Sequence, residues 1–255
     1  PHGGERDNLL ARSPDDPETC RACHAEFMKP LDKGSVHPAY TAGRCLRCHD
    51  VHGSNIPGMI VKKQGFLCYS CHGTDPDKAI KNIKSKHAPV VDGQCSACHS
   101  PHKAALSDLL LANYPDLCLA CHTDLKNDLY PPEKEESPES AAASDAAREV
   151  SSETKEQKVY IHAEAEMTNC SLCHRPHFAE EPALVNNPIQ TLCGRCHDLE
   201  VDTFAEAHIG IDPTVMDCRN CHRPHTADNP LFFKSAVHKP FADKACKDCH
   251  LVESQ

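Results

Sequence analysis

The cysteines of this chain follow a single pattern. All eighteen belong to Cys-x-x-Cys-His motifs, of which there are nine. Two thiols three positions apart lie about one helical turn from each other, so both can form thioethers with the vinyl groups of one haem. The histidine that follows is then placed to ligate the iron, so this spacing predicts c-type haem attachment. The predicted attachment residues are Cys20, Cys23, Cys45, Cys48, Cys68, Cys71, Cys95, Cys98, Cys118, Cys121, Cys170, Cys173, Cys193, Cys196, Cys218, Cys221, Cys246 and Cys249.

Other uses of the Cys-x-x-Cys pattern fit less well. Structural zinc sites often pair two such motifs to reach four ligands, and nine motifs cannot pair evenly. A redox-active pair needs a thioredoxin-like βαβ setting, and no alternation of strands and helices surrounds these motifs. No cysteine is left over for a structural disulfide. The sequence therefore predicts nine covalently attached c-type haems.

The histidines provide ligands for both faces of each iron. The predicted proximal ligands are His24, His49, His72, His99, His122, His174, His197, His222 and His250. Five histidines precede a motif, four of them by eight residues and one by ten, and these are His37, His87, His162, His238 and His208. Four more follow a motif histidine by three residues, namely His52, His102, His177 and His225. Five plus four equals the number of motifs, which predicts one distal histidine per haem and bis-histidine ligation throughout.

A histidine three residues after the proximal ligand cannot reach the opposite face of its own porphyrin. The four downstream histidines are therefore expected to serve other haems. His2 is the tenth histidine outside the motifs. Two interpretations of His2 stay open: a terminal residue without a ligand role, or a distal ligand of an end haem, in the same molecule or in trans on a neighbouring one.

Two kinds of motif alternate along the chain. A flanked motif, with histidines around it, is followed 23 residues later by a bare one, at 45 and 68, 95 and 118, and 170 and 193. Between Cys121 and Cys170 the spacing doubles, and residues 131–158 are charged and rich in Ser, Ala and Pro. This composition is typical of a linker. We expect a five-haem module at 1–130, an acidic linker at 131–158 and a four-haem module at 159–255.

The composition also predicts the fold class. Only 5% of the 255 residues are aromatic and there is no Trp, so apolar side chains are too few for a conventional core. We expect a mostly irregular chain with short α-helices and little or no sheet, packed around its haems. Residues 104–112 have apolar residues at helical spacing, which predicts a short helix against a haem.

Net charge and hydropathy exclude some classes of binding partner. Lys and Arg total 27 against 37 for Asp and Glu, a net charge of −10 that argues against nucleic acid and predicts a basic patch on a docking partner. No apolar run approaches 18 residues, so no transmembrane segment is expected. The first residues, PHGGERDNLL, lack the features of a signal peptide. We therefore expect a chain that stays inside the cell or one whose signal peptide has been removed.

The motif order resembles that of multihaem c-type cytochromes of the doubled CXXCH-motif class. Their signature is an upstream His, CxxCHxPH, a spacer and a bare LCxxCH. It is matched by KHAPVVDGQCSACHSPH (86–102) with DLCLACH (116–122), and by IHAEAEMTNCSLCHRPH (161–177) with TLCGRCH (191–197). The chain departs from it at the motif at 20, at CHDVH (48–52), which lacks the usual Pro, and in the 28-residue spacing before the last motif. The resemblance implies an exported mature chain that passes electrons between redox proteins in the periplasm, on the outer surface or outside the cell.

Three classes of function follow from these observations. Nine six-coordinate irons leave no open position for a substrate, which favours a non-enzymatic electron conduit in anaerobic or extracellular respiration. Such a conduit is either a relay or the subunit of a filament, a cytochrome nanowire. The alternative is a multihaem oxidoreductase with one five-coordinate haem, which related enzymes often mark with a CxxCK variant that is absent here. Haem storage would not explain the distal histidines.

Overall fold

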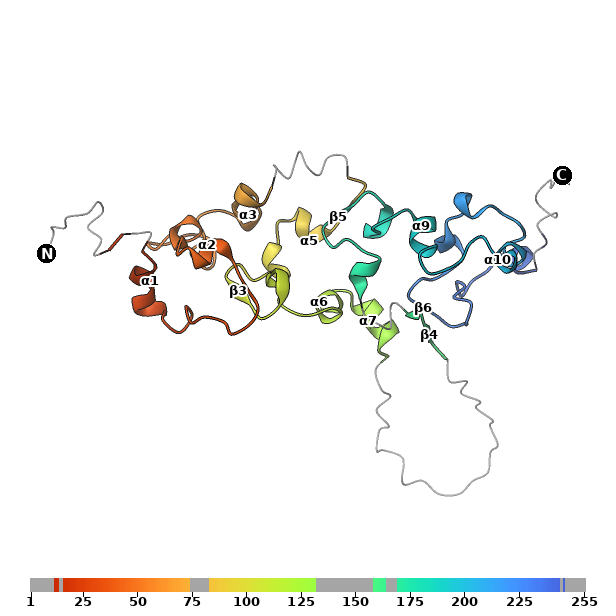
Figure 1. Cartoon of the computed structure of the whole chain (residues 1–255), viewed down its shortest axis with the longest axis horizontal. Coiled ribbons are helices and arrows are strands. Elements are labelled where there is room, and N and C mark those ends of the chain that lie inside the picture. The colour runs from red at the N-terminus through yellow and green to blue at the C-terminus, as the bar shows by residue number, and fades with distance from the viewer. Residues whose placement is uncertain are drawn as a thin grey trace, which may run out of the picture. The chain divides into compact units, whose positions relative to one another are not determined.

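The computed structural model describes residues 12–13, 16–73, 83–131, 158–163, 169–243 and 245. Within these ranges the helices are short and are joined by irregular connections (Figure 1). The longest helix there has nine residues. The predicted fold class, mostly irregular with short helices and little sheet, is therefore confirmed.

The secondary structure consists of small elements of three kinds. The α-helices are α1 (Pro17–His24), α2 (Pro38–Thr41), α3 (Gln64–His72), α5 (Ala88–Val91), α6 (Asp116–Leu119), α7 (Thr123–Leu129), α9 (Ile189–Cys193), α10 (Asp202–Ala207) and α11 (Lys239–Ala242). The 3-10 helices are η2 (Cys45–Arg47), η3 (Cys95–Ala97), η4 (Ser107–Leu109), η5 (Cys170–Leu172), η6 (Pro182–Leu184), η7 (Pro213–Val215) and η8 (Cys218–Asn220). The strands are β1 (Ser35–Val36), β2 (Ser85–Lys86), β3 (Lys103–Ala104), β4 (Tyr160–Ile161), β5 (Phe178–Ala179) and β6 (Thr226–Ala227).

The strands pair two by two across long sequence separations. All three pairs are antiparallel: β1 with β3, β2 with β5, and β4 with β6, the last labelled side by side in Figure 1. Each pair joins a segment that precedes an upstream histidine to a segment that follows a downstream histidine. The sheets therefore act as joints between successive repeats of the motif pattern.

The chain forms two compact units. One comprises Pro1–Leu117 with Cys173–Asn186, and the other Cys118–Leu172 with Asn187–Gln255. Of the predicted linker, residues 132–157 lie outside the described residues. The division into a five-haem and a four-haem module stays a prediction.

Protein side chains form little core. In the described part of the chain, the buried hydrophobic residues are Leu119, Leu129, Ala179, Val185 and Ala227. Large apolar side chains lie exposed instead, and Phe66 is 68% exposed. No helix among the described residues has both the length and the apolar character that crossing a bilayer requires.

The helix predicted over 104–112 is wrong. The structure has β3 there, then the 3-10 turn η4, in which Asp108 and Leu109 adopt left-handed φ angles of 55° and 58°. Left-handed residues interrupt an α-helix. The apolar spacing of this segment thus reflects a turn around the motif at 95, described below.

Close backbone approach fixes how a bare motif meets the next flanked motif. Gly93, two residues before Cys95, lies against Gly65, three residues before Cys68, and a Cβ on Gly93 would lie 2.7 Å from the Gly65 Cα. At the equivalent positions, a Cβ on Gly43 would lie 2.8 Å from the Cβ of Pro17. Gly43 and Gly93 are both buried, with φ of +68° and +69°. Glycine is required at both places for its conformation and for its lack of a side chain.

Gly93→Ala tests this approach, with Gly210→Ala as the matched control. Gly210 has nearly the same φ, +71°, but nothing lies within 4 Å of a Cβ there. The left-handed conformation should cost each variant about 1 kcal/mol. Gly93→Ala should lose a further ~2 kcal/mol because the α3 backbone must move. Denaturant unfolding of the holoprotein, followed by circular dichroism, measures both, and equal losses would contradict the close-approach argument.

Candidate functional site

The Cys-x-x-Cys-His motifs adopt two local conformations. Flanked motifs begin with the 3-10 turns η2, η3, η5 and η8. Bare motifs belong to α-helices: those at 20 and 68 end α1 and α3, and those at 118 and 193 begin in α6 and α9. In both kinds, the motif histidine amide donates to the carbonyl of the first cysteine, at 3.0 Å in His49 and 3.0 Å in His122. His2, Cys246, Cys249 and His250 lie outside the described residues.

In the flanked motifs a backbone carbonyl fixes the imidazole. The Nδ1 of each motif histidine lies within hydrogen-bond distance of the carbonyl oxygen nine residues later. The pairs are His49 with Gly58 (2.7 Å), His99 with Asp108 (2.7 Å), His174 with Ala183 (3.0 Å) and His222 with Leu231 (2.8 Å). Because a carbonyl only accepts, Nδ1 must donate, and Nε2 then keeps the lone pair that a metal requires.

A left-handed turn presents these carbonyls. The residue after each acceptor has a positive φ: Met59 (54°), Leu109 (58°), Leu184 (58°) and Phe232 (57°). The chain then returns along the motif, where the amide of Val61 donates to Cys48 O at 3.0 Å and that of Leu111 to Cys98 O at 3.0 Å. Equivalent bonds of 2.9 Å join Asn186 to Cys173 and Lys234 to Cys221. The same turn is thus built four times.

Sequence reasoning missed these acceptors. Every residue has a carbonyl, so Gly58, Asp108, Ala183 and Leu231 share no side-chain chemistry. The signal that could have found them is the constant nine-residue interval followed by two apolar residues, as in Met59–Ile60 and Leu109–Leu110.

Motif histidines face flanking histidines in pairs. The Nε2 atoms of His37 and His72 are 3.4 Å apart. The other ring pairs, with their centroid separations, are His49 with His102 (5.8 Å), His99 with His177 (5.9 Å), His162 with His197 (6.1 Å) and His208 with His222 (6.3 Å). Each of the five pairs combines one predicted proximal ligand with one predicted distal ligand.

The pairs follow two rules. An upstream histidine faces the motif histidine 35 residues later, as His37 faces His72 and His162 faces His197. A downstream histidine faces the flanked motif of the preceding repeat, as His102 faces His49. His208 is different, because it faces His222, the histidine of the motif that directly follows it. Its ten-residue offset from Cys218 is the sequence feature that sets it apart.

This donor set fits haem. A metal bound by an imidazole nitrogen lies about 2 Å from it, so two ligands on opposite sides of one metal lie about 4 Å apart, near the 3.4 Å between His37 and His72. Within the described residues, no group of three or more His, Cys, Asp or Glu side chains converges as a metal site. A pair of imidazoles completes the coordination of an iron whose other four ligands come from a porphyrin.

The electrostatics of the pairs favour neutral imidazole, the ligand form. Burial, and then the facing histidine, lower the pKa of His37, His102 and His177. One contact opposes ligation: the Ala39 amide donates to Nδ1 of His37 at 3.2 Å. Ligation through Nε2 requires Nδ1 to be protonated, so that hydrogen bond must open.

The strand joints bring upstream and downstream histidines together. The amide of His37 donates to the carbonyl of His102 at 2.8 Å, that of His87 to His177 at 3.0 Å, and that of His162 to His225 at 2.9 Å. Three predicted ligands stay apart: among the described residues, His24, His52 and His238 face no other imidazole. The His52 side chain is 95% exposed.

Consecutive motifs also meet through their first cysteines. The thiols of Cys20 and Cys45 hydrogen bond, as do those of Cys68 and Cys95. Burial, together with this contact, raises the pKa of Cys68 to about 11. In the other unit, a hydrogen bond from Cys193 lowers the pKa of Cys218 to about 6. At each of these contacts, motifs adjacent in sequence are adjacent in space.

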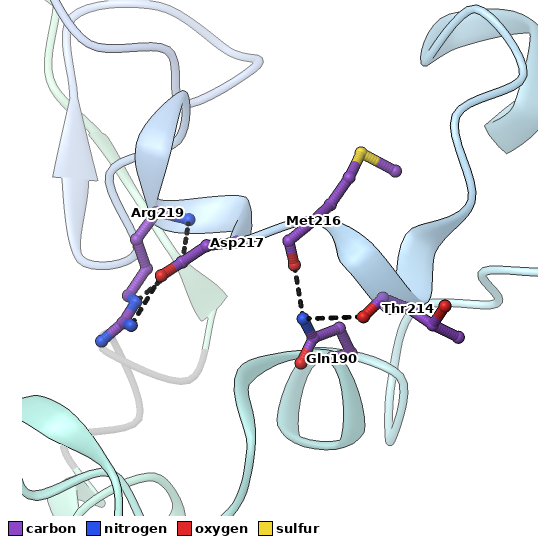
Figure 2. Close-up of polar contacts among 5 residues, drawn as sticks. All are labelled: Gln190, Thr214, Met216, Asp217 and Arg219. Carbon is purple, nitrogen blue, oxygen red and sulfur yellow. Dashed lines mark hydrogen bonds and ion pairs between the residues drawn. The ribbon is translucent and has the colours of Figure 1, made fainter.

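A polar network holds the last of these contacts (Figure 2). The Nε2 of Gln190, on α9, donates to the carbonyls of Met216 (2.6 Å) and Thr214 (3.4 Å). Beside Met216, the carboxylate of Asp217 accepts from the Arg219 guanidinium at 2.7 and 2.9 Å, which lowers the pKa of Asp217. Gln190 and Met216 occupy the positions that Gly65 and Gly93 occupy at the earlier contact. A side-chain hydrogen bond thus replaces backbone packing.

Substitution of Gln190 tests this network. Gln190→Ala should lower the free energy of unfolding by about 1–2 kcal/mol through two lost hydrogen bonds. Gln190→Glu should cost more, because a carboxylate would then face two carbonyl oxygens. Gln94→Ala is the control, since the Gln94 side chain is exposed. Thermal unfolding measures all three, and a Gln190→Glu variant as stable as the native protein would contradict the assigned donor role.

Comparison with known proteins agrees with this geometry. Residues 37–77, 87–127 and 162–201 each match the family model described as the doubled CXXCH motif. Each match begins at an upstream histidine and includes one flanked and one bare motif, and together the matches cover just under half of the chain. No curated protein shows significant similarity. The three matches indicate covalently attached c-type haems and support a multihaem c-type cytochrome that functions in electron transfer.

Proposed function

We propose that this chain is a nine-haem c-type cytochrome that conducts electrons and is not an enzyme. The observation that carries the proposal is the set of five facing imidazole pairs, each joining a motif histidine to a flanking one. Bound haem supplies reversible one-electron chemistry. The chain supplies the thiols and the axial ligands.

The residues around the motifs serve conduction in two ways. The facing imidazoles would hold the iron of a bound haem from both sides, so a substrate would find no open coordination site. The contacts between first cysteines, as between Cys68 and Cys95, bring consecutive attachment points together. The 35-residue interval between upstream and motif histidine also separates His87 from His122 in the sequence. All three matched repeats therefore share one ligand arrangement.

The proposal includes a location and partners. The chain is exported and works in the periplasm, on the outer surface or outside the cell, in anaerobic or extracellular respiration. It exchanges electrons with other redox proteins, either as a relay between them or as the subunit of a filament. The net charge of −10 favours partners with a basic docking patch.

One observation favours the alternative, an oxidoreductase with a five-coordinate haem. In the described part of the chain, His24 is exposed and faces no imidazole. Carbon monoxide binding by the native, reduced protein distinguishes the two functions. A conduit with nine six-coordinate haems stays unreactive, whereas an open haem at the motif at 20 binds the gas.

The haem number gives the first prediction of this proposal. The denatured holoprotein should retain nine haems, because all eighteen cysteines lie in motifs. Mass spectrometry, referred to the 28.0 kDa of the polypeptide, counts them, and the pyridine haemochrome absorbance gives an independent number. Zinc in place of haem, or fewer than nine haems in fully matured protein, contradicts the proposal.

The second prediction concerns the facing pairs. His102→Ala removes the imidazole opposite His49, so one haem should become high-spin and bind carbon monoxide. Tyr40→Phe is the control, because the Tyr40 ring also contacts His102, at 5.4 Å between centroids, but offers no imidazole. Electron paramagnetic resonance and carbon monoxide difference spectra measure the change. An unchanged low-spin spectrum in His102→Ala means that His102 is not the distal ligand of the motif at 45.

A further inference from the structure

The joints between repeats have two complementary halves. The first half is a short strand, an upstream histidine at a helix N-cap, and a four-residue helix: β1, His37 and α2, or β2, His87 and α5. The second half is a downstream histidine and the strand after it: His102 with β3, or His177 with β5. In the other unit, β4 with His162 meets His225 with β6 in the same way.

Joining the halves buries them. The strand residues Ala179, Thr226 and Ala227 are buried, and His102 and His225 are half-buried. The joint also places ligands, since His102 faces His49 and His177 faces His99. In both cases, the motif histidine that is faced lies 12 residues after the upstream histidine of the joint.

One second half has no partner within the described residues. His52 follows its motif histidine by three residues, as His102 does, and its motif has the same carbonyl turn, with His49 Nδ1 2.7 Å from Gly58 O. Yet the His52 side chain is 95% exposed, and Gly53 and Ser54, which correspond to β3, are exposed and belong to no strand. The carbonyl turn of this half is therefore formed and its surface is unpaired, but Gly53, with a φ of 138°, must become extended before the segment can pair as a strand.

One first half is also unpaired within the described residues. His238 is the N-cap of the four-residue helix α11, with φ and ψ of −62° and 127°, close to the −67° and 131° of His37. Val237 and His238 correspond to Val36 and His37, and Pro follows within two residues in both segments. In contrast to their counterparts Ser35 and His37, which are partly buried, Ala236 and His238 are exposed, and no strand forms at 236–237.

We propose that these two unpaired halves bind each other between copies of this chain. Residues 236–238 of one copy pair with 52–54 of the next, in the geometry of the β1–β3 joint. His52 then reaches a haem of the neighbouring copy.

The same contact also supplies an imidazole opposite His24, which faces none among the described residues. In the β1–β3 joint, the upstream histidine of the first half faces the histidine of the bare motif that precedes the second half: His37 faces His72, and the motif at 68 precedes His102. The bare motif that precedes His52 is the one at 20. His238 of one copy therefore faces His24 of the next.

Such a contact is heterologous, because it uses different surfaces on the two copies. Heterologous contacts repeat from copy to copy and produce rings or open filaments. The proposal rests on the proposed function, since it assigns His24, His52 and His238 as haem ligands. It adds to that function the surface through which haems of different copies become adjacent.

The test uses holoprotein with one half of the contact disabled at a time. His52→Ala and His238→Ala each alter an exposed side chain, so both variants should fold and retain their haems. Asp50→Asn is the control, because it removes the charge beside His52, with Oδ1 3.8 Å from its Nδ1, but keeps an oxygen that accepts from the His52 amide at 3.0 Å. Sedimentation velocity over a wide concentration range measures assembly.

The native protein and Asp50→Asn should assemble with increasing concentration, and each histidine variant alone should associate at least tenfold more weakly. A mixture of His52→Ala with His238→Ala is the decisive sample. The first variant keeps an intact 236–238 segment and the second an intact 52–54 segment, so the mixture should form a dimer that grows no further. A native protein that stays monomeric overturns the inference, and so does a mixture without dimer.

Haem content measured on the same samples separates this inference from the proposed function. Nine attached haems without assembly overturn the contact between copies alone. A haem-free protein overturns the proposed function and the contact with it.

Discussion

The structure depends on one constraint: the imidazole opposite a motif histidine cannot come from the same Cys-x-x-Cys-His motif. In two of the five facing pairs it comes from a different repeat, as His102 does for His49, and in two others it joins the two motifs of one repeat, as His37 does for His72. Each repeat must therefore extend into its neighbour. The two-stranded joints hold the exchanged histidines in place, since the amide of His37 donates a hydrogen bond to the carbonyl of His102 itself.

Backbone contacts explain how a chain with so little core among its described residues holds these ligands in place. Precise positioning comes from backbone contacts rather than from packed side chains: the carbonyl of Gly58 against His49, and Gly65 against Gly93. Both depend on left-handed backbone, which is costly for most residues and is repaid here by a fixed imidazole or a close approach. The large apolar side chains that lie exposed, Phe66 among them, fit an interior completed by porphyrin faces.

Repetition makes the exceptions informative. Three equivalent joints show what a complete contact looks like, so the exposed His52 and the exposed His238 are recognised as halves of that contact. The unusual offset of His208 is recognised in the same way, because it faces its own motif rather than a neighbouring one.

The amino-acid sequence by itself determined the nine motifs, the two classes of flanking histidine and the mostly irregular fold class with short helices and little sheet. These follow from residue types at short, constant intervals, which thioether and imidazole chemistry requires and which any reader can count. Only the tertiary structure decided that His37 faces His72 and that His102 faces His49, because each of these pairs joins two different motifs far apart in the sequence. It also revealed the carbonyls of Gly58 and Asp108, and it replaced the helix expected at 104–112 by a turn. A backbone carbonyl is present on every residue, so its role depends on where the chain folds and leaves no trace in side-chain identity.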